Sequence, residues 1–180
     1  MRKILLFVMT VFALGMSSCK KVEKQVDKLL TFTISDEYAF QMPAVPFAAT
    51  FPPQSFPTST DATEDYRKAN TAANLVKDVK LDALTLTATG PSGSNFDFLE
   101  NVTFYISTDM QGTDRVQMAS LMTVPRGVST INLEPSTGNL DKYLKAENYV
   151  LTVQTTFRTP LRQNTDMRMN YQFKVTADPL

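Results

Sequence analysis

Apolar and polar residues alternate along most of the chain after residue 30, which is the period of a strand with one buried face. Residues 167–175 carry the clearest run, with Met, Tyr, Phe or Val at every second position. A change of phase near Ala83 indicates a β-bulge in an otherwise regular strand. Together the alternating runs predict seven strands, over residues 30–42, 79–88, 102–107, 116–123, 128–133, 149–157 and 167–175.

Turn residues such as Gly90-Pro91-Ser92-Gly93 separate these strands, and helices do not alternate with them. The chain is therefore predicted to be mainly β, an antiparallel β-sandwich of about seven strands with an immunoglobulin-like or Greek-key arrangement. One short α-helix is predicted over residues 62–76, because Asp61 and Glu64 form a capping box before a stripe of apolar residues. A further helical turn is predicted over residues 139–145.

Residues 43–57 read PAVPFAATFPPQSFP and hold five prolines among three phenylalanines. Proline excludes a helix interior and a central strand, so this segment is expected to be extended and polyproline-like. Phe47, Phe51 and Phe56 have two interpretations: they dock on a partner protein, or they cover one end or edge of the sandwich. The second is preferred, because exposed apolar patches are uncommon on monomers.

The first eighteen residues have a different pattern from the rest of the chain. Arg2 and Lys3 precede an almost unbroken apolar run from Ile4 to Leu14, and small residues follow. This is the layout of a secretory signal peptide, and the apolar run is too short for a permanent membrane span. Residues 1–18 are therefore predicted to be removed during export.

The only cysteine of the chain lies directly after this segment. Met16-Ser17-Ser18-Cys19 resembles the lipobox of bacterial lipoproteins, in which the cysteine becomes the lipidated N-terminus of the mature protein. The family usually has Leu where this chain has Met16. The resemblance implies a diacylglycerol on the Cys19 thiol and an acyl chain on its amine, enough for stable anchoring in a membrane. Residues 19–28 then form a charged tether, and residues 29–180 a single β-sandwich domain.

The residues after Cys19 bear on which membrane holds the protein. Lipoproteins retained in the inner membrane commonly carry Asp directly after the cysteine, whereas this chain has Lys20, so the outer membrane is expected. The general style of the chain resembles Bacteroidota-type lipoproteins, many of which reach the cell surface by an acidic signal after the cysteine. Residues 20–24 hold three lysines and one acid. The choice between the cell surface and the periplasmic face stays open.

Composition excludes several classes of function. The chain has 180 residues, no histidine and one cysteine, which the lipid would occupy. Zinc, copper and haem sites built from His or Cys are thereby excluded, as are disulfides and histidine-dependent nucleophiles, and no cofactor is expected. Charges balance at 18 basic and 18 acidic residues, and removal of Arg2 and Lys3 leaves the mature chain at −2. No basic stripe indicates a nucleic-acid partner.

The remaining candidate sites are weak. Asp109 and Asp114 flank a short turn and are candidates for calcium, but the loop lacks the run of acidic ligands of an EF-hand. Tyr38, Tyr105 and Tyr149 are available to stack on sugar rings, although the chain has no tryptophan.

These patterns predict a lipid-anchored, non-catalytic protein of the outer membrane that serves in protein interaction or assembly. Its predicted contacts are the membrane, through the lipid on Cys19, and an outer-membrane protein. The first alternative is a lipoprotein that binds glycans or small ligands. The second is a carboxylate-based hydrolase, which needs two acids that meet across a cleft.

Overall fold

Eight strands and three short helical segments make up the part of the chain that the computed structural model describes, residues 30–59, 63–69, 71–146 and 148–177. The predicted signal peptide, Cys19 and the tether lie outside these residues. The helical segments are α3 (Thr63–Lys68), the 3-10 helix η1 (Ala73–Leu75) and α4 (Asp141–Lys145). The strands are β1 (Thr31–Met42), β2 (Gln54–Ser59), β3 (Val76–Gly90), β4 (Leu99–Ser107), β5 (Val116–Leu121), β6 (Thr130–Pro135), β7 (Asn148–Phe157) and β8 (Thr165–Ala177).

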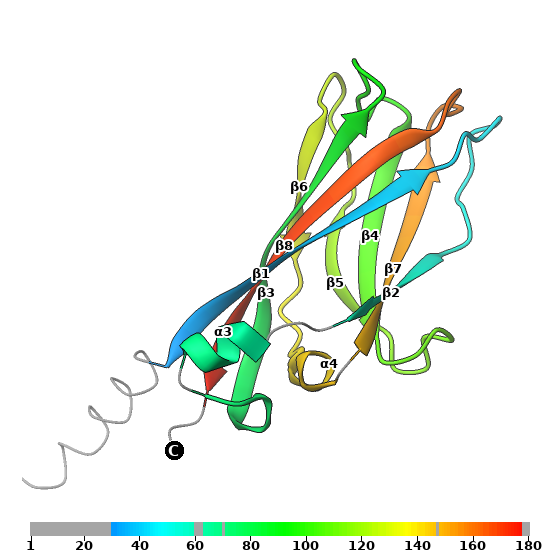
Figure 1. The fold of residues 1–180 in the computed structure, drawn as a ribbon. Coiled ribbons are helices and arrows are strands. Elements are labelled where there is room, and N and C mark those ends of the chain that lie inside the picture. The colour runs from blue at the N-terminus through cyan, green and yellow to red at the C-terminus, as the bar shows by residue number, and fades with distance from the viewer. Residues whose placement is uncertain (1–29, 60–62, 70, 147, 178–180) are drawn as a thin grey trace, which may run out of the picture.

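The strands form one antiparallel sheet in the order β1-β8-β3-β6-β5-β4-β7-β2, which curls into two layers (Figure 1). The turn between the layers is the short β5–β6 pairing of Ala119 with Pro135 and Ser120 with Glu134. The pairs β1–β8, β2–β7, β3–β6 and β4–β5 describe one long hairpin that is wound into a sandwich. This is the strand order of a jelly roll, which contains two Greek keys. The antiparallel sandwich prediction is confirmed, with a jelly-roll order in place of an immunoglobulin-like one.

The core lies between the two layers, and the alternation of the sequence accounts for it. In β8 the odd-numbered residues 167–175 are buried, while Arg168, Asn170, Gln172 and Lys174 are exposed. The register between β3 and β8 shifts between Leu81 and Ala83, which confirms the predicted bulge.

The helix prediction for the segment before β3 is wrong in extent. The helix predicted over 62–76 ends at Lys68, because Val76 instead pairs with Ala177 and is buried at the start of β3. Strand β2 begins within the proline-rich segment and lies at the edge of the sheet, as expected for an extended segment that is excluded from a central strand. Pro57 is tolerated there because an edge strand needs hydrogen bonds on one side only. The predicted helical turn is confirmed as α4.

A row of three hydrogen-bonded polar side chains runs from the edge strand β1 into the core. Asp36 occupies a core-facing position of the edge strand β1, directly opposite Tyr171 of β8. The Tyr171 hydroxyl donates to the Asp36 carboxylate at 3.0 Å and hydrogen-bonds the Tyr149 hydroxyl at 2.8 Å. Burial raises the pKa of both tyrosines. A charged residue on an edge strand also discourages pairing with another chain.

The Tyr171→Phe substitution tests this row of hydrogen bonds. It leaves the buried Tyr149 hydroxyl without its partner, so we expect a loss of about 1–3 kcal/mol in the free energy of unfolding, measured by urea denaturation. Tyr38→Phe is the control, because the Tyr38 ring is half-buried and its hydroxyl has no hydrogen-bond partner among the described residues. Equal denaturation midpoints for Tyr171→Phe and the wild type would contradict the assignment.

Candidate partner-binding site at the loop end

The winding of the strands gives the sandwich two different ends (Figure 1). We call one the loop end; it holds residues 43–53, 91–98, 122–129 and 158–164, which connect β1–β2, β3–β4, β5–β6 and β7–β8. The other, the helix end, holds α3, α4, the β4–β5 loop and the start of β1. No helix among the described residues has the length and apolar character needed to cross a membrane.

Backbone hydrogen bonds tie the four loops of the loop end together. The Val45 amide donates to the Leu161 carbonyl at 2.7 Å, and the Phe96 amide donates to the Val128 carbonyl at 2.9 Å. Arg158 links three of the loops, since its amide donates to the Phe98 carbonyl and its Nη2 to the Val124 carbonyl at 2.6 Å. Loops that are held in this way lose little conformational entropy when they bind a partner.

A side-chain network orients the two loops that form one corner of this end. Asn164 accepts the Ala44 amide at 2.8 Å and donates to the Gln41 side chain at 3.0 Å. Gln41 in turn donates to Asp166 at 2.9 Å. A Cβ atom at Gly90 would lie 2.6 Å from a carboxylate oxygen of Asp166, so a side chain there would displace the Asp166 carboxylate.

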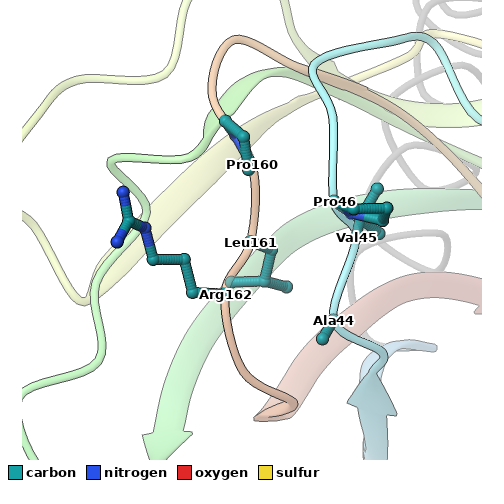
Figure 2. A pocket seen from close by; sticks show the side chains of 6 residues that line it. All are labelled: Ala44, Val45, Pro46, Pro160, Leu161 and Arg162. Carbon is teal, nitrogen blue, oxygen red and sulfur yellow. The ribbon is translucent and has the colours of Figure 1, made fainter.

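Between these two loops lies an open cavity of about 440 Å³ (Figure 2). Val45 and Leu161 are buried in its walls, and Pro46 and Pro160 stiffen the two segments that face each other. Arg162 is exposed and contributes the only charged side chain of the lining. The walls of the cavity are therefore apolar, and the Arg162 side chain extends away from Val45 and Pro46 (Figure 2).

A column of phenylalanine rings runs from the core to the surface of the loop end. Phe98 contacts Phe157 with ring centroids 5.1 Å apart, and Phe157 contacts Phe51 at 4.8 Å. Phe47 stacks on Phe51 at 5.9 Å with the ring planes 25° apart, yet 57% of its surface stays exposed. Phe47 is thus a rigidly supported aromatic side chain at the outer end of the column.

Phe56 has a different environment from Phe47 and Phe51. Its ring lies 5.1 Å from that of Phe40 and 5.6 Å from that of Tyr38, so it covers the gap between the two edge strands β1 and β2. The preferred interpretation of the three phenylalanines, covering the sandwich, agrees with the positions of Phe51 and Phe56. Of the three, Phe47 alone has the exposure that a partner contact needs.

The structure also exposes Met122, which the sequence pattern had placed inside a strand. Strand β5 ends at Leu121, and 70% of the Met122 surface is exposed in the β5–β6 loop. No signal in the alternation marks this residue as exposed. The loop end therefore carries two large exposed apolar side chains, Phe47 and Met122.

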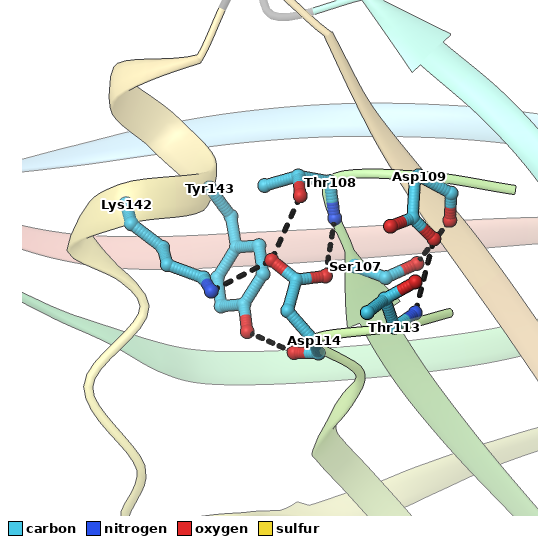
Figure 3. Close-up of polar contacts among 7 residues, drawn as sticks. All are labelled: Ser107, Thr108, Asp109, Thr113, Asp114, Lys142 and Tyr143. Atoms are coloured by element: carbon cyan, nitrogen blue, oxygen red, sulfur yellow. Dashed lines mark hydrogen bonds and ion pairs between the residues drawn. The ribbon is translucent and has the colours of Figure 1, made fainter. Parts of the chain in front are cut away.

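The two candidate calcium ligands lie in the β4–β5 loop at the helix end (Figure 3). Asp109 accepts the Thr113 amide at 3.0 Å. Asp114 accepts the Thr108 amide and hydroxyl, both at 2.8 Å, and pairs with Lys142 of α4 at 2.7 Å. Both carboxylates thus accept hydrogen bonds from residues of the β4–β5 loop itself. Within the described ranges, no group of three or more His, Cys, Asp or Glu residues is placed to hold a metal ion.

The tyrosines proposed for sugar stacking are engaged by the protein. Tyr149 is buried, and Tyr38 packs against Phe40 and Phe56. Tyr105 has the Arg115 guanidinium 4.8 Å from the centre of its ring.

Comparison with known proteins adds no function to this geometry. No protein-family model matches the chain, and no curated protein matches it significantly. Among solved structures, the chain is similar to the decameric BFDV capsid protein, with 9% identity, a TM-score of 0.36, and coverage of 81% of this chain and 99% of that one. The structure of turnip yellow mosaic virus is 12% identical with a TM-score of 0.26, and the match covers 83% of this chain and 96% of that one. A carbohydrate-binding module from the β-sandwich superfamily is 11% identical with a TM-score of 0.30, and the match covers 83% of this chain and 56% of that one. These TM-scores are too low for a functional inference.

Alanine substitutions separate the roles of the phenylalanines. Phe51→Ala removes the middle of the ring column, so we expect a loss of about 2–3 kcal/mol in the free energy of unfolding. Phe47→Ala removes a mostly exposed ring, and we expect a change within about 0.5 kcal/mol. Urea denaturation of both variants measures the difference. A Phe47→Ala variant as unstable as Phe51→Ala would assign Phe47 to the core.

The β4–β5 loop has a testable pH dependence. The hydrogen bond from Lys142, and next that from the Thr108 amide, lower the pKa of Asp114 to about 2. The unfolded chain has the ordinary pKa of about 3.9, so the stabilisation is complete above about pH 5 and is lost progressively as the pH falls toward 2. We therefore expect Asp114→Asn to lower the melting temperature at pH 7 and to lose less stability than the wild type between pH 4 and 2. If the melting temperatures of Asp114→Asn and the wild type fall in parallel over this pH range, the pairing of Asp114 with Lys142 is contradicted.

Proposed function

We propose that this protein is a lipid-anchored, non-catalytic accessory of the outer membrane that binds a partner protein through its loop end. The observation that carries the proposal is the exposed Phe47 ring, supported from behind by the phenylalanine column and placed at the end opposite the start of β1. A large apolar ring that the fold holds at the surface is the kind of residue that anchors protein interfaces.

The direction of β1 orients the molecule relative to the proposed anchor. Cys19 lies eleven residues before Leu30, so an extended tether reaches about 36 Å from the bilayer to the helix end. Strand β1 then runs for twelve residues, or about 40 Å, to the loop end. A lipid on Cys19 would thus hold the helix end near the membrane and present Phe47 and Met122 away from it.

A protein partner fits the loop end better than a glycan. The exposed side chains there are a phenylalanine and a methionine on loops that are already hydrogen-bonded to one another. Rigid loops and an apolar anchor favour binding to a protein surface. Glycan binding remains the second candidate of the sequence, but the three tyrosines that suggested it already contact other side chains.

The anchor is tested by Cys19→Ser. We expect the wild type to incorporate labelled palmitate and to fractionate with the outer membrane, because the acyl chains bury many methylene groups in the bilayer. The Cys19→Ser variant should carry no label and should leave the membrane fraction. Protease treatment of intact cells then distinguishes a surface domain, which is digested, from a periplasmic one. A Cys19→Ser variant that stays in the membrane fraction would refute the lipid anchor.

The binding surface is tested by photo-cross-linking in living cells. A photoreactive phenylalanine analogue replaces Phe47 in one strain and Met110 in another; Met110 is a matched control, because 53% of its surface is exposed in the β4–β5 loop at the helix end. We expect a discrete cross-linked partner from position 47 and none of the same mass from position 110. Failure to obtain a specific product at position 47 would refute binding through the loop end.

A further inference from the structure

The pairing of β1 with β8 is the longest uninterrupted ladder among the described strands. All twelve residues of β1 pair without a shift of register, from Thr31 with Thr176 at the helix end to Met42 with Thr165 at the loop end (Figure 1). By contrast, three shifts interrupt the ladder between β3 and β8. Strand β1 contains no glycine and no proline. It is therefore one continuous extended segment that joins the two ends of the sandwich.

The chain leaves the loop end of β1 with little slack. Only five residues lead from the end of the strand at Met42 to Phe47. Met42 and Val45 each precede a proline, which restricts their backbone to extended conformations. The Val45 amide donates to the Leu161 carbonyl at 2.7 Å, so the segment is attached to the sandwich. The proposed lipid site at Cys19 and the exposed ring are thus connected to opposite ends of one strand.

An extended strand cannot lengthen much under tension. A residue in a β-strand spans about 3.2–3.4 Å along the chain, and a fully extended residue spans at most about 3.3–3.6 Å. A pull on both ends of β1 is therefore carried by its covalent backbone, and no hydrogen bond of the sheet has to break. The other described strands carry no load in this geometry.

We propose that β1 is a tension-bearing strand, which carries a pull between the lipid on Cys19 and a partner held at Phe47 without unfolding the domain. The inference rests on the proposed function, since it takes the anchor and the contact surface from it. It adds a mechanical role, because a partner at the loop end stays coupled to the membrane while the two are pulled apart.

Two other pairs of attachment points would load the hydrogen bonds of the fold. Met122 is also at the loop end, but a pull between it and Cys19 slides β1 along β8. Ladder hydrogen bonds lie across the strands, so this sliding loads all twelve residue pairs together. A pull between the two ends of the chain instead separates Thr31 from Thr176 first and then loads one pair after another. The three geometries therefore predict three different responses to force.

Optical-tweezers measurements on the complete mature chain, residues 19–180, test these responses. The chain is produced without lipid, so that the Cys19 thiol takes one DNA handle and a second, introduced cysteine takes the other. The second cysteine comes from Ala48→Cys, Met122→Cys or Leu180→Cys. Positions 48 and 122 are both exposed at the loop end, and Ala48 directly follows Phe47, whose ring stays in place. Urea denaturation of each variant verifies that its fold is retained before it is pulled.

We expect the chain held at positions 19 and 180 to unfold at the lowest force, because its residue pairs are loaded in turn. Held at positions 19 and 122, it should unfold at a force at least about twofold higher, because the ladder between β1 and β8 is loaded as a whole. Held at positions 19 and 48, it should show no unfolding step at that higher force, since the handles pull on the two ends of one extended strand.

Position 122 is the matched control for position 48, because both lie at the loop end and only position 48 continues directly from β1. A step at or below the force for positions 19 and 122, which releases more than the few residues between Met42 and the handle at position 48, would overturn the inference. Equal unfolding forces for the handles at 19 and 122 and for those at 19 and 180 would overturn it as well.

The force measurement uses no partner, which separates this inference from the proposed function. If the photoreactive residue at position 47 captures a partner in cells, but a pull between positions 19 and 48 unfolds the domain, the loop end binds a partner and the tension-bearing role is wrong. If position 47 captures no specific partner, the proposed function fails, and the tension-bearing role fails with it. Capture at position 47, together with no unfolding step between positions 19 and 48, supports both.

Discussion

The winding of one long antiparallel hairpin is the constraint on which the rest of the structure depends. Pairing of β1 with β8 and of β2 with β7 brings distant parts of the chain into adjacent strands, and strands that follow one another in the chain run in opposite directions. Successive connections must therefore alternate between the two ends. Four loops meet at one end, while the helices and the start of β1 occupy the other. The division of the molecule into a membrane-facing end and a binding end, which we propose, follows from this topology.

Side-chain packing within the loop end gives this end of the fold a defined surface. The column from Phe98 through Phe157 and Phe51 supports Phe47 from the core side, so that its ring is held at the surface without being buried. The hydrogen bond from the Val45 amide to the Leu161 carbonyl joins the two segments that line the cavity. Support by the ring column and the shape of the loops thus coincide on one surface, and each has a separate structural cause.

Local patterns in the sequence were sufficient to predict individual strands and the helical turn at α4, whereas the pairing of distant strands was not predictable from them. The alternation in residues 167–175, the bulge near Ala83 and the turn at α4 all depend on neighbouring residues, and the structure confirms them. The jelly-roll order depends on which strands meet, which a period of two does not specify. The helix predicted to reach residue 76 failed because pairing with β8 overrides helical spacing at Val76. The three phenylalanines share one sequence context, so only tertiary contacts separate Phe47 from Phe56.

The central claim is that the fold presents its loop end away from the membrane, and a direct measurement of height tests it. With the proposed diacylglycerol on the Cys19 thiol, a cysteine introduced by Met122→Cys or Met110→Cys is the only free thiol of the chain. Each single-cysteine protein is labelled with a fluorophore in reconstituted vesicles that contain lipids with a quencher on the headgroup. The account predicts stronger quenching at position 110 than at position 122. Equal quenching at the two positions, or stronger quenching at position 122, would contradict it.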